Sequence, residues 1–142
     1  QGGNPRRVAV GLDQNRLSML LAILNRHAGI FCADKDVFVN VVGGVKVSET
    51  AADLALLAAI LSSFWDKALP RDLVIFGEAG LSGEIRPVPS GVERTLEAEK
   101  HGFTKAIIPN SNVAEKHFTS MRCKGVKKLS DAVDYLQDIL RG

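Results

Sequence analysis

The stretch VFVNVVGGVKVSETAADLALLAAILSS, residues 37–63, decides the fold of this chain. Its first part is a run of β-branched and aromatic residues that is apolar on both faces, which predicts a strand in the middle of a sheet with cover on each side. Two glycines and a group of hydroxyl and charged side chains lead into a segment made almost entirely of Ala and Leu. We expect a helix from about residue 50 to residue 68, ending before Pro70. Because this helix carries one charge in roughly four turns, we expect protein nearly to surround it.

Strands and helices alternate on both sides of this stretch. The expected strands cover residues 6–12, 30–33, 37–44, 72–78, 84–88, 105–109 and 123–129. The expected helices cover residues 13–29, 50–68, 90–101 and 130–141, with Asp13 and Ser130 as N-caps, Thr50 and Asp53 as a weak capping box, and Gly29 and Gly102 as stops. The glycine-rich residues 77–88 predict a tight hairpin, and residues 110–118 a short helical loop. This order indicates an α/β sandwich with mixed strand pairing.

The size and composition are those of a single globular domain. The chain has 142 residues, of which 46% are apolar and 24% charged. We interpret residues 1–5 as a linker or cloning remnant, residues 6–142 as one domain, and the whole as a fragment of a longer protein. The net charge of +2 permits contact with nucleic acid without requiring it. No signal peptide is visible, and the most apolar run, residues 51–65, is shorter than the ~20 residues of a membrane span, so we expect no membrane partner.

Neither the cysteines nor the histidines form a metal-binding or redox motif. Cys32 and Cys123 belong to no C-x-x-C pair, and we interpret them as reduced, mostly buried thiols. The three histidines, His27, His101 and His117, have no H-E-x-x-H partner and lie near predicted helix ends or loops. The glycines of residues 77–83 lack the dinucleotide-binding spacing, and no P-loop motif occurs. We therefore expect no metal and no cofactor within this chain.

A hydroxyl and an amine near the start of the Ala/Leu helix leave two interpretations open. Ser48 or Thr50 could be a nucleophile if burial lowered the pKa of Lys46 enough for that amine to take its proton. In the simpler interpretation Ser48 and Thr50 cap the helix and Lys46 stays in solvent.

Two blocks identify a family resemblance. VFVNVVGGVKVSETAADLALLAAILSS and DLVIFGEAGLSGEIRPVPSGVERTLEAEKHGFTKAIIP resemble the C-terminal domain of the RadA (Sms) family of bacterial DNA-repair proteins, a domain that is in turn similar to the proteolytic domain of Lon. The resemblance covers residues 7–140, and VNVVGG and FGEAGLSGEIRPV are its most specific parts. It implies a Lon-protease-like two-layer α/β fold with a mixed sheet and about four helices.

The same resemblance implies that the proteolytic dyad is degenerate. The P-S-A-G turn that carries the Lon serine falls on TAAD, residues 50–53, and places Ala51 at the nucleophile position. The lysine base lies five residues past a hairpin proline, here Pro87, and its position holds Val92 in PSGVER. A slip of one residue would bring Thr50 to the first position, but a hydroxyl without its base is a poor nucleophile. The resemblance therefore implies a pseudo-protease, with a residual Ser/Thr peptidase as the alternative.

The resemblance also implies properties of a longer protein. RadA-type proteins combine a four-cysteine zinc finger, a RecA-like ATPase and this domain, and they form hexameric rings that drive branch migration on single-stranded or branched DNA. ATP, Mg and Zn would accordingly bind outside this chain, and a recombinase is a possible partner. The expected location is the bacterial cytoplasm, in association with the nucleoid.

What this chain could supply is ring assembly and a DNA-facing surface. Phosphate contacts require Lys or Arg on one surface and no base code. The candidates are Arg6, Arg7, Lys46, Arg86, Arg94, Lys100, Lys105, Lys124, Lys127 and Lys128. A weak, non-specific affinity of one domain would be multiplied in a ring. A protein-interaction module that never contacts DNA is the remaining alternative.

Overall fold

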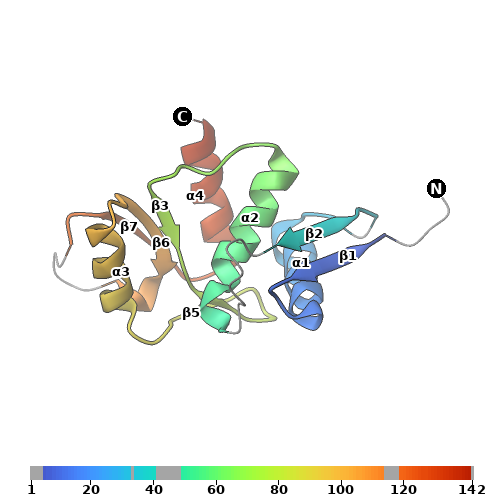
Figure 1. Cartoon of the computed structure of the whole chain (residues 1–142), viewed down its shortest axis with the longest axis horizontal. Helices are drawn as coiled ribbons and strands as arrows, with labels where there is room; N and C mark the ends of the chain where they lie inside the picture. Colours follow the sequence, from blue (N-terminus) through green and yellow to red (C-terminus); the bar gives the residue numbers. More distant parts are fainter. Residues whose placement is uncertain (1–4, 33, 41–48, 114–118, 142) are drawn as a thin grey trace. The chain divides into compact units, whose positions relative to one another are not determined.

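A computed structural model describes residues 5–32, 34–40, 49–113 and 119–141 (Figure 1). Its contacts divide the chain into two compact units, Gln1–Glu49 and Thr50–Gly142, which are described separately below. Within the described ranges there are four α-helices and both parallel and antiparallel strand pairs. The α/β fold class predicted from the sequence is thus confirmed.

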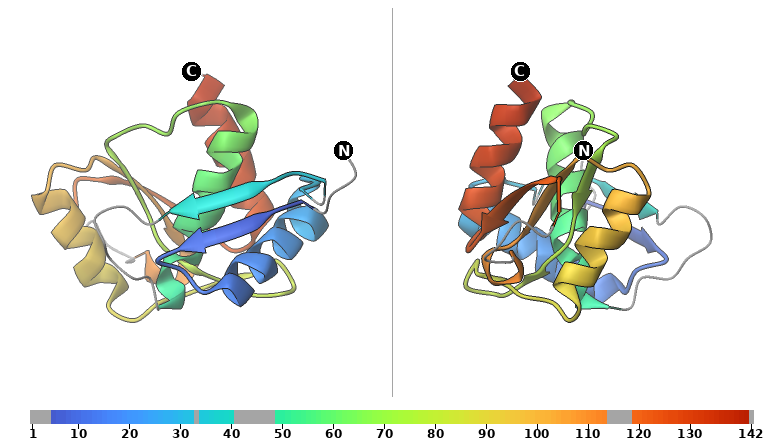
Figure 2. Two further views of the ribbon diagram at one scale, coloured as in Figure 1. Left: turned by 45° about the vertical axis from the view of Figure 1, so that its right-hand side comes forward. Right: turned by 90° about the vertical axis from the view of Figure 1, so that its left-hand side faces the viewer.

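The first unit is a β-α-β arrangement of β1 (Arg7–Val10), α1 (Gln14–Ala28) and β2 (Val37–Asn40). The two strands pair in parallel, in the register Val8↔Phe38, and lie side by side in Figure 2. Helix α1 begins and ends as predicted. The Asp13 side chain accepts a hydrogen bond from the backbone N–H of Arg16 at 3.0 Å, and Gly29 ends the helix in the left-handed conformation.

Two predictions about this unit are wrong. Residues 30–32 form no strand. The Cys32 carbonyl accepts a hydrogen bond from the Arg7 side chain, at 2.6 Å from Nη2, and not from the backbone of a neighbouring strand. Strand β2 is not interior either, since among the described residues it pairs with β1 alone. One face of the pair is open to solvent, and the Phe38 side chain is 60% exposed.

The second unit contains the larger sheet and the remaining helices. Its elements are η2 (Thr50–Ala52), α2 (Asp53–Trp65), β3 (Leu73–Ile75), β4 (Glu78–Ala79), β5 (Ile85–Arg86), α3 (Gly91–Lys100), β6 (Lys105–Pro109), η3 (Asn110–Asn112), β7 (Arg122–Val126) and α4 (Leu129–Arg141). Strands β3, β6 and β7 form a parallel sheet in that order, and β4 pairs with β5 as the predicted hairpin.

Strand β6 lies at the centre of this sheet and is covered on both faces. Ala106 and Ile108 belong to a buried cluster that includes Ala98 of α3, and Ile107, on the opposite face, is fully buried. Helices α3 and α4 lie on opposite sides of β6 and β7 (Figure 2).

Three details of the helices differ from the sequence predictions. Helix α2 ends at Trp65, where Asp66 takes the left-handed conformation, and protein does not surround it throughout, since Phe64 is 42% exposed. No side chain caps its start, because the Asp53 carboxylate instead accepts the backbone N–H of Ala79. Helix α4 begins at Leu129, so Ser130 lies within its first turn and is not the N-cap. None of the described helices combines the length and apolarity that a membrane crossing requires.

Candidate functional site

Ala51 lies in a tightly hydrogen-bonded junction between η2 and the end of β3. Its carbonyl accepts the Gly77 N–H at 2.8 Å, and the Gly77 carbonyl accepts the Leu54 N–H at 3.0 Å. Gly77 has φ +151°, and a Cβ there would approach Ile85 Cγ2 to 3.1 Å, so the junction requires glycine. The Ala51 methyl is 6% exposed and packs in the apolar cluster of this unit. At this position the chain offers a methyl group and no attacking oxygen.

Asp53, two residues after Ala51, is the only buried acidic residue among those that the structure describes. Its side chain is 1% exposed, and Oδ2 accepts the Ala79 N–H at 2.9 Å. This bond ties the first turn of α2 to β4 across 26 residues of sequence. A buried carboxylate occupied in this way has a structural role, since a hydrogen bond to a charged group is among the stronger ones in proteins.

Val92 lies in the first turn of α3, in a loop-helix junction that Asn112 holds. The Asn112 side chain accepts the Val88 N–H at 2.9 Å and donates to the Val88 carbonyl at 3.1 Å. A Cβ at Gly91 would meet the Asn112 amide at 2.4 Å, so the close approach depends on glycine. The half-buried Val92 side chain is aliphatic and cannot accept a proton. Lys46 and Ser48, which the peptidase alternative requires, lie outside the described residues.

The candidate phosphate ligands are distributed over both units, and several are engaged within the protein. Arg86 forms two bonds to Glu84 Oε2, at 2.9 Å from Nε and 2.6 Å from Nη2. These bonds raise the pKa of Arg86, while the backbone N–H of Glu84, followed by Arg86, lowers the pKa of the Glu84 carboxyl. Lys105 Nζ contacts Asp72 at 2.9 Å. An anion at Arg86 or Lys105 would compete with a carboxylate already in place.

The other candidates lie apart from these two. Arg94 Nε donates to the Pro89 carbonyl at 2.9 Å, and Lys100 is exposed at the end of α3. In the first unit, the guanidinium of Arg7 donates to backbone carbonyls, whereas that of Arg6 lies over the Phe38 ring, 5.7 Å from its centroid. Several of the described candidates are thus already engaged with other groups of the protein.

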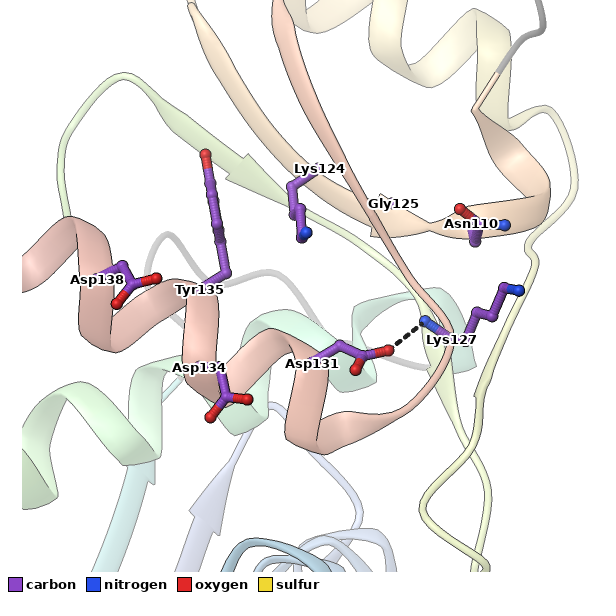
Figure 3. Close-up of a pocket in the computed structure, with 8 residues that line it drawn as sticks. All are labelled: Asn110, Lys124, Gly125, Lys127, Asp131, Asp134, Tyr135 and Asp138. Carbon is purple, nitrogen blue, oxygen red and sulfur yellow. Dashed lines mark hydrogen bonds between the residues drawn. The ribbon is translucent and has the colours of Figure 1, made fainter.

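Lys124 and Lys127 line a cavity of about 360 Å³ between β7, η3 and α4 (Figure 3). The other lining residues are Asn110, Gly125, Asp131, Asp134, Tyr135 and Asp138. The Lys124 ammonium lies 5.8 Å from the Tyr135 ring centroid, and Asp131 Oδ2 accepts the Lys127 N–H at 3.1 Å. Two cations thus share the cavity with three carboxylates, so a phosphate would meet repulsion as well as attraction.

This cavity was not predicted as such from the sequence, although its parts were visible. The aspartates follow one another at helical spacing in residues 131–138, and the lysines of residues 124–128 are close in sequence. The sequence pattern does not reveal that the turn after β7 brings these lysines and aspartates together. Lys128, the third lysine of this segment, is exposed and lies outside the lining.

The cysteines and histidines form no reactive centre in the described part of the chain. Burial raises the pKa of both the Cys32 and Cys123 thiols, and neither forms a disulfide. His101 Nδ1 contacts the Glu97 carbonyl at 2.8 Å, and His27 is half-buried, while His117 lies outside the described residues. In those residues no group of three or more His, Cys, Asp or Glu side chains is placed to hold a metal ion.

Comparison with known proteins gives a family and a set of relatives. The family model ChlI, described as subunit ChlI of Mg-chelatase, matches residues 7–112. The chain is 65% identical over 136 residues to DNA repair protein RadA of Escherichia coli (strain K12), which is 96% of this chain and 30% of that protein. It is 64% identical over 136 residues to RadA of Salmonella typhimurium, again 96% and 30%, and 48% identical over 132 residues to RadA of Aquifex aeolicus, 93% and 29%. The chain therefore spans about 30% of the length of these relatives.

Proposed function

The chain belongs to the family of subunit ChlI of Mg-chelatase, and from this membership and its RadA relatives we propose that it is a non-proteolytic scaffold domain of a RadA-type DNA-repair protein. The observation that carries the proposal is 65% identity over 96% of the chain to a protein named for DNA repair. The same name accompanies relatives down to 48% identity. The family description names a chelatase subunit, but the high identity favours DNA repair as the role of this chain.

The chemistry at the degenerate dyad positions supports the non-proteolytic part of the proposal. A nucleophile must carry an oxygen or sulfur atom and needs a base to remove its proton. Ala51 and Val92 offer neither, and Ala51 is buried in an apolar cluster. On this proposal the region around η2 has a structural role, in which the backbone bonds of Gly77 to Ala51 and Leu54 join it to the end of β3.

For the whole protein we extend the proposal by resemblance. It would be a DNA-dependent ATPase that forms a hexamer and drives branch migration, with a zinc finger and with ATP and Mg bound in parts of the protein beyond these 142 residues. Its partners would be single-stranded or branched DNA and a recombinase, in the bacterial cytoplasm at the nucleoid. This domain would contribute contacts between subunits and a non-specific DNA contact.

The charge distribution indicates where such a DNA contact is favoured. The first unit, Gln1–Glu49, contains six Lys and Arg against four Asp and Glu, whereas Thr50–Gly142 contains twelve of each. The net charge of the chain thus resides in its first 49 residues. A charge of +2 gives weak phosphate binding for one copy, and repetition around a ring raises the effective concentration of the contact.

DNA binding of the assembled protein, measured across a salt series, tests this proposal. We expect the assembled form to bind more tightly than the isolated 142-residue chain, with an affinity that falls as salt is raised. Equal, salt-independent binding by the two forms would overturn it. Casein cleavage that the pair Ser48→Ala and Thr50→Ala abolishes would overturn its non-proteolytic part.

Charge reversal separates a DNA-binding scaffold from a pure interaction module. We expect Lys46→Glu combined with Arg86→Glu to weaken DNA binding of the assembled protein. The matched control is Lys67→Glu, which reverses an exposed lysine outside the candidate set. Unchanged DNA binding in the double variant would favour the interaction module.

A further inference from the structure

The parallel pair β1–β2 has an open face that its own unit does not cover. In the register Val8↔Phe38 and Val10↔Asn40, these four side chains lie on one face of the pair, which we name the open face. Val8 is 38%, Val10 55% and Phe38 60% exposed, and Asn40 is also exposed. The intervening residues are half-buried, and α1 contacts β1. Parallel sheets are normally covered on both faces, so this face is suited to a ligand.

A cation lies near the exposed aromatic ring of the open face. Arg6 immediately precedes β1, and its guanidinium carbon lies 5.7 Å from the centroid of Phe38. A carboxylate from a distant part of the sequence also lies beside Arg6: Asp36 Oδ1 accepts the backbone N–H of Arg6 at 2.7 Å. The Arg6 side chain is exposed and so can reach an anion beside the ring.

This combination matches single-stranded nucleic acid better than an apolar partner. Proteins that bind single strands stack bases on exposed aromatic rings and contact the backbone with Arg or Lys. Phe38 supplies the ring, Arg6 the phosphate contact, and the Asn40 amide a hydrogen-bonding group for a base edge. The open face also belongs to the unit that carries the net positive charge.

We infer that the open face of β1–β2 is a single-stranded nucleic-acid contact, with a base stacked on Phe38 and a phosphate paired with Arg6. The inference rests on the proposed DNA-repair function and names the surface that carries it. It assigns no base specificity, since every base has a face that can stack.

The test uses the 142-residue chain and a fluorescein-labelled oligothymidylate at low salt. We expect Phe38→Ala to weaken binding roughly fivefold or more, as loss of one stacked base does. The matched control is Phe64→Ala, which removes another exposed ring, 42% exposed and in the other unit, and should leave the affinity unchanged. Arg6→Ala should flatten the slope of log affinity against log salt by about 0.7.

Ultraviolet cross-linking followed by tryptic digestion locates the contact without any substitution. Cleavage after Lys35 and Lys46 releases residues 36–46, which contain Phe38, whereas Phe64 falls in residues 47–67. We expect the thymidine adduct on the first of these peptides.

The outcomes distinguish this inference from the function on which it rests. Binding that Phe38→Ala leaves intact, or an adduct confined to residues 47–67, would overturn the inference and leave the DNA-repair proposal standing. Absence of DNA binding in every form, the assembled protein included, would remove the proposed function itself. A drop in the sedimentation mass of Phe38→Ala with no change in DNA binding would make the open face a contact between copies, and would also overturn the inference.

Discussion

Strand β6 lies between two strands and under helices on both faces, whereas the described β2 has one strand neighbour and one open face. Four of the five β6 residues are buried, and Ile107 and Ile108 have no exposed area. In β2 the alternate residues are exposed, and Phe38 is exposed to 60%. The difference shows that an apolar strand contributes to stability only where its neighbours remove it from water.

The same contrast separates the two units. Thr50–Gly142 has equal numbers of acidic and basic residues around a buried central strand, while Gln1–Glu49 has the excess positive charge and the open face. The balanced charge and buried strand of Thr50–Gly142 suit a structural role. The positive charge and open face of Gln1–Glu49 suit the binding of an anionic partner. Three substitutions measure how far this division of roles extends.

Truncation of the central strand should have the largest effect. Ile107→Ala removes fully buried methyl groups and leaves a cavity, so we expect the free energy of unfolding to fall by about 2–5 kcal/mol. Phe38→Ala, by contrast, should change it by roughly 0.5 kcal/mol or less. Urea unfolding of the two variants measures both values. Losses of equal size would show that β2 is as buried as β6, and the comparison would fail.

Removal of the Asp53 carboxylate should have an intermediate effect. In Asp53→Ala the buried N–H of Ala79 loses its acceptor, which should cost about 1.5–3 kcal/mol of unfolding free energy. Asp134→Ala, which removes an exposed carboxylate of α4, is the matched control and should stay within roughly 0.5 kcal/mol of wild type. If both variants unfold at the same urea concentration, the link from α2 to β4 does not stabilise the second unit.

The smallest effect is expected at Asp72, and it depends on pH. Hydrogen bonds from Thr104, then Lys105, lower the pKa of the Asp72 carboxyl in the folded protein. A lowered pKa means that its stabilisation is present above the unfolded-state pKa and is lost as the pH falls through the folded-state value. Wild type should therefore exceed Asp72→Asn in stability at neutral pH, and the gap should close in acid.

Thermal unfolding over a pH series reads out this difference. Asp138→Asn, which loses only an exposed contact to Arg141 at 3.6 Å, provides the comparison. A gap between wild type and Asp72→Asn that stays constant down to strongly acid pH would show that the start of β6 gains nothing from this carboxylate.

The parts of the fold that depend on local interactions were predictable from the sequence. The limits of α1 follow from the Asp13 cap and Gly29, both of which act within one turn of the helix. The hairpin of β4 and β5 was also predicted, since turn glycines mark it.

The errors arose where a distant partner decides the conformation. Thr50 and Asp53 have the spacing of a cap, but Asp53 bonds to Ala79, 26 residues away. The run at residues 30–32 has the composition of a strand, but the Arg7 side chain takes the Cys32 carbonyl. No local pattern in the sequence contains either partner.

The candidate site was predictable in its chemistry more than in its geometry. The sequence gives aliphatic residues at positions 51 and 92, and the resemblance matches these positions to the dyad. Their roles as degenerate dyad positions stay predictions. The basic residues were named, but the pairing of Arg86 with Glu84 and the placing of Lys124 beside Tyr135 depend on the folded chain. The open face was hidden, because its residues have the pattern of a buried strand.

Amide hydrogen exchange with and without oligothymidylate tests most directly whether the two units divide the work in this way. We predict that the oligonucleotide slows exchange in β1 and β2 and leaves β6, already protected by its neighbours, unchanged. Slowing confined to residues 50–141, or none in the assembled protein, would contradict the assignment of DNA contact to the first unit.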